Sequence, residues 1–148
     1  MVGRRPRLPD APELRVGRGA VSLLLDTHAA LWLVQGDSRL GNAARTRIER
    51  APRSELFISD LLMLELAMLI KKGRVTVKAE PTAFLDRLAR CFQVVPLDST
   101  IAVRAMDLPL PDGDPFDRVF VATALGLDAE LVTRDGAIRD SGLVTVVW

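Results

Sequence analysis

Acidic residues stand where apolar runs of this sequence end and where a helix-like segment begins. They are Asp26, Asp114, Asp117 and Asp135. Aspartate is a preferred helix N-cap, so each of them taken singly fits a capping role. Carboxylates gathered at one edge of a sheet instead repel one another unless a cation is present, and all-oxygen ligands favour Mg²⁺ or Mn²⁺. The pattern therefore leaves two interpretations open, helix caps and a metal site.

Glu65 lies inside the apolar segment Leu61–Ile70. Its neighbours three and four positions away are all apolar, so no basic side chain of its own helix can pair with it. A helix this apolar is expected to be buried, and a buried carboxylate needs a compensating group from another element. A metal ion is one such group. The alternatives are a cross-helix salt bridge to an arginine or a position at the helix edge facing water.

The residue types point to phosphodiester hydrolysis. One divalent ion can activate a water while a second holds the developing charge on the leaving oxygen, so no histidine base is needed. The chain has one histidine, His28, and one cysteine, Cys91, which excludes a zinc cluster and an internal disulfide. We expect Cys91 to be a buried structural thiol.

Short apolar runs alternate with helix-length segments along the chain. The expected strands are Val21–Leu25, Leu56–Ile58, Val94–Val95, Glu130–Thr133 and Leu143–Val147. The expected helices are Thr27–Gln35, Asn42–Ala51, Asp60–Lys72, Pro81–Phe92, Ser99–Asp107 and Pro115–Gly126. This alternation predicts an α/β fold, a three-layer α/β/α sandwich around a central, mainly parallel five-stranded sheet. The working site of such a sheet lies beyond the carboxyl ends of its strands.

The composition suits one compact domain. The chain has 148 residues, of which 49% are hydrophobic and 26% charged, and this excludes a disordered or low-complexity protein. Residues 1–20 contain five arginines and are expected to form a flexible basic tail, with the folded domain at 21–148. No apolar stretch is long enough to span a bilayer, and the start lacks a convincing signal peptide. We expect a cytoplasmic protein without a membrane partner.

Four segments, in this order, carry a family resemblance. They are Leu23–Trp32 with Asp26, Ser59–Gly73 with Glu65, Asp114–Arg118, and Leu131–Asp135. Over residues 21–148 the chain resembles PIN domains, and more narrowly the VapC-type toxin ribonucleases of bacterial toxin–antitoxin pairs.

The resemblance implies a specific fold and site. It implies a sheet in strand order 3-2-1-4-5, a homodimer, and a Mg²⁺ or Mn²⁺ site formed by Asp26, Glu65, Asp117 and Asp135. One acid is usual at the helix start that holds Asp114 and Asp117, and we favour Asp117 as the inner ligand and Asp114 as a cap or outer ligand. The remaining candidates for supporting or substrate-contacting roles are Thr133, His28 and Arg118.

We therefore expect a metal-dependent endoribonuclease. It would cut RNA by in-line attack of an activated water, leaving a 5′-phosphate and a 3′-hydroxyl, and a small cognate antitoxin would restrain it. A PIN-like domain without catalysis, which only binds protein or RNA, is the alternative. A phosphoacceptor receiver domain also has acids at strand ends, but it needs a lysine after a late strand and Val144–Trp148 has none.

Overall fold

A five-stranded parallel sheet forms the centre of the computed structural model, which describes residues 20–148. The strands are β1 (Leu23–Leu25), β2 (Leu56–Ser59), β3 (Gln93–Val95), β4 (Glu130–Val132) and β5 (Val146–Val147). Their order is β3-β2-β1-β4-β5, and every neighbouring pair is parallel. The predicted order 3-2-1-4-5 is confirmed. The expected basic tail lies outside the described residues except for its last position.

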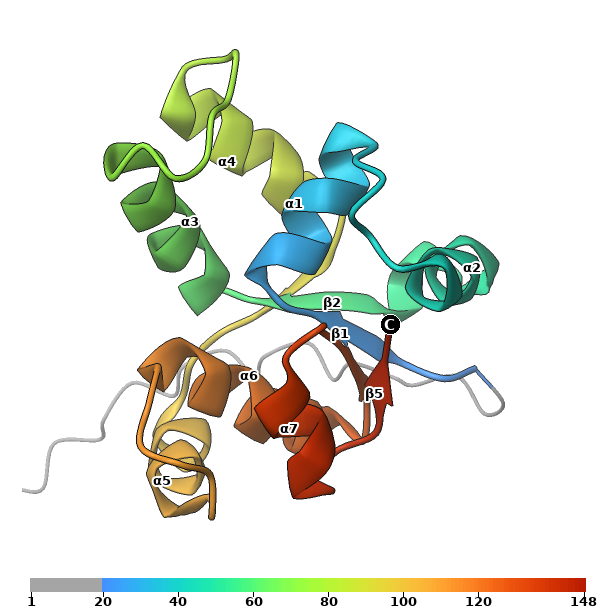
Figure 1. Ribbon diagram of the computed structural model, residues 1–148, viewed down its shortest axis with the longest axis vertical. Coiled ribbons are helices and arrows are strands. Elements are labelled where there is room, and N and C mark those ends of the chain that lie inside the picture. The colour runs from blue at the N-terminus through green and yellow to red at the C-terminus, as the bar shows by residue number, and fades with distance from the viewer. Residues whose placement is uncertain (1–19) are drawn as a thin grey trace, which may run out of the picture.

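Helices cover both faces of the sheet, which confirms the three-layer sandwich. They are α1 (Thr27–Gln35), α2 (Asn42–Arg50), α3 (Leu61–Lys71), α4 (Pro81–Arg90), α5 (Ser99–Asp107), α6 (Pro115–Leu127) and α7 (Gly136–Ser141), with the 3₁₀ turn η1 (Arg53–Glu55). In Figure 1, α1, α3 and α4 lie on one side of the strands and α5, α6 and α7 on the other. The short elements α7 and η1 were not predicted, because neither is long enough to show a helical period.

The central strand shows why the apolar runs form this sheet. All three leucines of β1, Leu23–Leu25, are buried, as expected for a strand covered by helices on both faces. Its partners on either side, β2 and β4, are also apolar and buried at Phe57, Ile58, Leu131 and Val132. The predicted strand Val21–Leu25 began two residues too early, since β1 starts at Leu23 and Val21 is 48% exposed, outside this packing.

Two burial predictions were wrong. Only Leu62 and Leu66 of α3 are buried, whereas Leu64 is 55% and Met68 38% exposed, so one side of this helix is open to solvent. Cys91 is exposed at the end of α4, where its Sγ donates to the carbonyl of Arg87. Within residues 20–148, no helix has the length and apolarity to cross a membrane.

Candidate active site

Five acidic side chains from four parts of the chain line one cavity of about 330 Å³. They are Asp26, Glu65, Asp114, Asp117 and Asp135. Asp26 follows β1 and Asp135 lies just beyond β4, and these strands are neighbours in the sheet. Glu65 lies on α3 and the other two acids at the start of α6, and these helices are in contact. The structure therefore brings together every acid that the sequence singled out.

Three of the aspartates cap helices. Asp26, Asp114 and Asp135 are the N-caps of α1, α6 and α7, and each accepts a first-turn backbone N–H through Oδ1, at 2.8, 2.9 and 3.0 Å. The capping interpretation is thus correct for all three. It does not exclude a metal site, because a carboxylate has two oxygens and each cap hydrogen bond occupies one.

Glu65 is half-buried at the edge of the cavity and takes its hydrogen bond from another helix. The hydroxyl of Thr27 on α1 donates to Glu65 Oε2. None of the ion pairs found among residues 20–148 involves Glu65, so the predicted alternative of a salt bridge to an arginine is not what the structure shows. The hydroxyl fixes the carboxylate without neutralising its charge.

The electrostatics of the cavity disfavour the charged form of three of its acids. Burial raises the pKa of Asp117 to about 7, and the charges of the other four acids add to the effect. Burial also raises the pKa of Asp26 and of Glu65. Hydrogen bonds from Thr133 and Thr27 oppose these two shifts but do not cancel them. A bound cation would reverse the effect, because it favours the ionised form of every neighbouring carboxyl group.

The donor set fits Mg²⁺ or Mn²⁺. All five groups are carboxylates, which these hard ions prefer, and the cavity has no cysteine and a single histidine. As the side chains stand, no three His, Cys, Asp or Glu residues within 20–148 converge closely enough to ligate one ion. Uncompensated like charges repel, so a bound cation would favour closer convergence of these carboxylates.

Thr133 lies between two of the acids. It is fully buried, and its Oγ1 accepts the backbone N–H of Asp135 at 3.1 Å. Its side chain also lowers the pKa of Asp26, against the larger effect of burial. The hydroxyl therefore holds the backbone at Asp135 and lies close to Asp26, and its role as a supporting residue stays a prediction.

Arg118 has a different place from the other predicted site residues. Its guanidinium donates to the carbonyls of Ala105, Leu108 and Leu110 at 3.1, 2.9 and 2.7 Å. These bonds fasten the end of α5 and the loop that leads to Asp114. Arg118 therefore positions the start of α6, while His28 is exposed and lines the acid cavity.

Sequence reasoning missed part of the cavity wall. Trp32, Arg134 and Trp148 line the cavity although none of them was predicted as a site residue, and Thr27 holds Glu65. Arg134 lies between Thr133 and Asp135, so its place in the motif was a usable signal. Trp148 had none, because only the pairing of β5 with β4 brings it to this edge.

Comparison with known proteins identifies the family. Residues 23–142 match the PIN domain, and this span includes all five acids. The chain belongs to the PIN-domain family. This PIN domain is 34% identical over 119 residues to Ribonuclease VapC22 of Mycobacterium tuberculosis, a match that covers 80% of this chain and 90% of that protein.

Solved structures share the fold of this PIN domain. A toxin–antitoxin complex from Klebsiella pneumoniae matches with a TM-score of 0.61 and 23% identity, over 84% of this chain and 96% of that one. VapC20 of Mycobacterium tuberculosis, a toxin that cleaves the sarcin–ricin loop, matches with a TM-score of 0.61 and 21% identity, over 86% and 100% of the two chains.

Proposed function

We propose that this PIN domain is a Mg²⁺- or Mn²⁺-dependent endoribonuclease and the toxin of a toxin–antitoxin pair. The observation that supports it most strongly is the gathering of five carboxylates in one cavity, with the pKa of Asp117 raised to about 7 by burial and by the other four. Acids arranged in this way lower the stability of the metal-free protein, which is typical of a functional site rather than of a structural one. The 34% identity to Ribonuclease VapC22 supports RNA as the substrate.

Asp26, Glu65, Asp117 and Asp135 would hold the ion, with Asp114 as cap and outer ligand. A divalent ion there supplies Lewis acidity, which lowers the pKa of a water and stabilises charge on the leaving oxygen. The chain's own part is preorganisation. Helix caps fix Asp26 and Asp135, and Thr27 fixes Glu65 before substrate arrives.

An RNA-cleavage assay tests this proposal. The purified protein with Mn²⁺ should cut RNA, and Asp26→Asn should lower the rate by about 10³-fold, the order of loss expected when charge stabilisation at a reacting centre is removed. Asp86→Asn makes the same chemical change on an exposed acid of α4 outside the cavity and should cleave like wild type. Circular dichroism checks that both variants fold.

Two results would contradict the proposal. Cleavage that persists in EDTA would remove the metal from the mechanism. RNA binding without cleavage at any Mn²⁺ or Mg²⁺ concentration, in a protein that binds the ion, would favour the alternative of a PIN-like binding module.

We also propose a small antitoxin as partner and a homodimer as the assembly. The solved structures that share this fold include toxin–antitoxin complexes. An arginine on an inhibitory segment of the antitoxin could pair with the five carboxylates of the acid cavity.

The homodimer would need an apolar interface. On α5, Val103 and Met106 are exposed apolar side chains, as a subunit interface would need. Sedimentation velocity of wild type and Val103→Glu tests the dimer, which the charge should dissociate.

A further inference from the structure

A buried indole supports part of the acid cavity's wall. Trp32 on α1 is 2% exposed. The rings of His28 and Trp148 lie 5.3 and 5.9 Å from its ring, centroid to centroid, and the Cζ atom of Arg134 lies 4.8 Å from its centroid. All three of these neighbours line the cavity. Packing on one rigid ring gives them a fixed arrangement.

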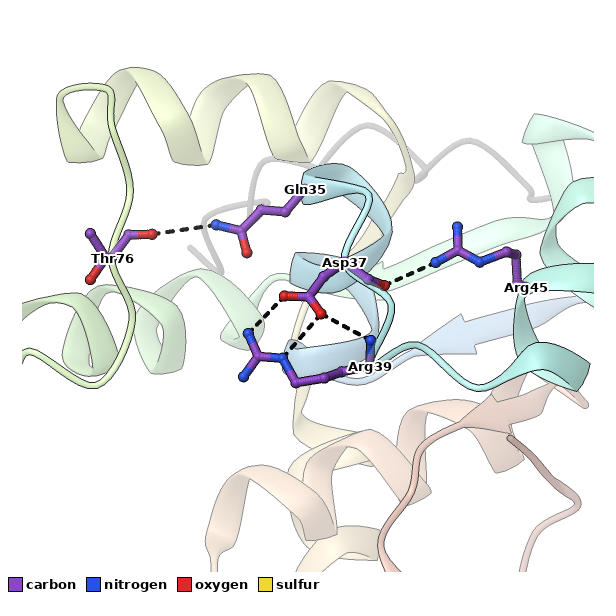
Figure 2. Close-up of polar contacts among 5 residues, drawn as sticks. All are labelled: Gln35, Asp37, Arg39, Arg45 and Thr76. Carbon is purple, nitrogen blue, oxygen red and sulfur yellow. Dashed lines mark hydrogen bonds and ion pairs between the residues drawn. The ribbon is translucent and has the colours of Figure 1, made fainter.

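Two arginines lie over this ring, and they differ in how their charges are paired. Arg39 has its Cζ 4.9 Å from the Trp32 centroid, and its Nε and Nη2 donate to Asp37 at 3.1 and 2.7 Å (Figure 2). Arg134 makes no ion pair with any carboxylate of residues 20–148, and its side chain is exposed. The charge of Arg39 is therefore paired within the protein, whereas the N–H donors of the Arg134 guanidinium are available to a ligand.

Charge indicates what that ligand is. Five carboxylates line the cavity, and Arg134 is the one lysine or arginine among the lining residues within the described part of the chain. An RNA strand that enters must bring phosphates beside these acids. The planar fork of a guanidinium matches two phosphate oxygens, so Arg134 can compensate a phosphate that bound ions do not reach.

Trp148, like Arg134, lies against the ring of Trp32. It lines the acid cavity and also a second cavity of about 560 Å³ that includes Asn42 and Arg47. A Cβ added to Gly41 would lie 2.7 Å from the backbone carbonyl carbon of Trp148, 2.8 Å from its Cδ1 and 2.9 Å from its Nε1, so Trp148 occupies space that only glycine leaves free. An aromatic side chain that lines both cavities is well placed to stack on a base as the strand passes from one to the other.

We propose that Arg134 and Trp148 form an RNA subsite beside the acids, in which Arg134 binds a phosphate next to the scissile one and Trp148 stacks on the adjacent base. The inference rests on the proposed ribonuclease function and adds the residues that hold the strand.

The salt dependence of RNA binding tests Arg134. A short fluorescent single-stranded RNA is titrated by anisotropy at several KCl concentrations and constant Mn²⁺, with all proteins in the Asp26→Asn background that keeps the RNA intact. Loss of one phosphate contact should reduce the slope of log K against log[KCl] by about 0.7 for Arg134→Gln. Arg134→Lys should retain most of the slope. Arg39→Gln, on the same indole but with its charge already paired, should leave it unchanged.

Base stacking by Trp148 has its own variants. Trp148→Leu should weaken RNA binding about tenfold, and Trp148→Phe should retain most of the affinity because a ring remains. Gly41→Ala should also weaken binding, since Gly41 has φ −58°, which alanine adopts freely, and the added methyl would displace both the backbone and the indole of Trp148. Melting temperatures confirm that the variants are folded.

The inference is overturned if Arg134→Gln keeps the wild-type slope, if Arg39→Gln loses as much, or if Trp148→Leu binds RNA like the parent. Cleavage by the protein with Asp26 restored is measured separately. A failure of the ribonuclease proposal therefore shows in that assay and not in the salt slope.

Discussion

The turn after α1 and the acid cavity use aspartate in opposite ways. Asp37 accepts two side-chain hydrogen bonds from Arg39, which lower its pKa to about 2 (Figure 2). Asp117 has burial and four other carboxylates around it, and its pKa rises to about 7. A carboxylate compensated within the chain stabilises the fold, whereas uncompensated carboxylates at one place destabilise it unless they take up a proton or a cation.

The largest difference between the acid cavity and the turn that holds Asp37 is expected in metal binding. Mn²⁺ at about 100 times its Kd should stabilise wild type by ~2.7 kcal/mol, because the ion binds the folded protein and not the unfolded chain. Glu65→Gln should lose most of this effect, and Asp37→Asn should keep it. Thermal melting of wild type and the two variants with and without Mn²⁺ measures this stabilisation. A wild-type melting temperature that does not respond to Mn²⁺ would contradict the metal site.

The pH dependence of stability should follow Asp117. Because the folded protein binds its proton up to about pH 7 and the unfolded chain only up to the ordinary value of 3.8, the free energy of unfolding of the metal-free protein should fall as pH rises through this interval. Asp117→Asn should flatten that part of the profile. Urea unfolding in EDTA at pH 4 to 8 tests it, and parallel profiles for both proteins would show that Asp117 lacks the raised pKa.

Neutralising Glu65 should stabilise the metal-free protein. Glu65→Gln keeps an oxygen that can accept the Thr27 hydroxyl and removes one charge from the cluster, so the free energy of unfolding in EDTA should rise by about 1 kcal/mol. The matched change Asp86→Asn should have little effect. A lower melting temperature for Glu65→Gln would mean that its carboxylate has a structural partner.

The smallest effect is expected at Asp37. Its pKa is lowered in the folded protein, so its contribution to stability is present above about pH 4 and is lost as pH falls toward 2. Asp37→Asn should therefore destabilise the protein slightly at neutral pH and not at pH 2. High salt should shrink the neutral-pH difference, because the Arg39 pair is exposed and screened. If the stability difference between wild type and Asp37→Asn did not depend on salt, it would come from packing and not from the ion pair.

Local patterns in the sequence determined the elements and the acids. The leucines of β1 and the other short apolar runs predict buried strands, and the caps at Asp26, Asp114 and Asp135 follow from short-range hydrogen bonds. Periodicity and capping depend on residues a few positions apart, so they are visible in the sequence alone. The strand order and the choice of Asp26, Glu65, Asp117 and Asp135 as one ligand set came with the family resemblance.

Only the tertiary structure decided which charged groups have a partner and which helix faces are buried. Glu65 receives its hydrogen bond from Thr27, 38 positions earlier, and α3 is half-exposed although its sequence is apolar all round. The neighbours of Trp32 come from the turn after α1, the segment after β4 and the residue after β5. Burial, charge compensation and ring stacking depend on which elements become neighbours in space, and no local pattern records that.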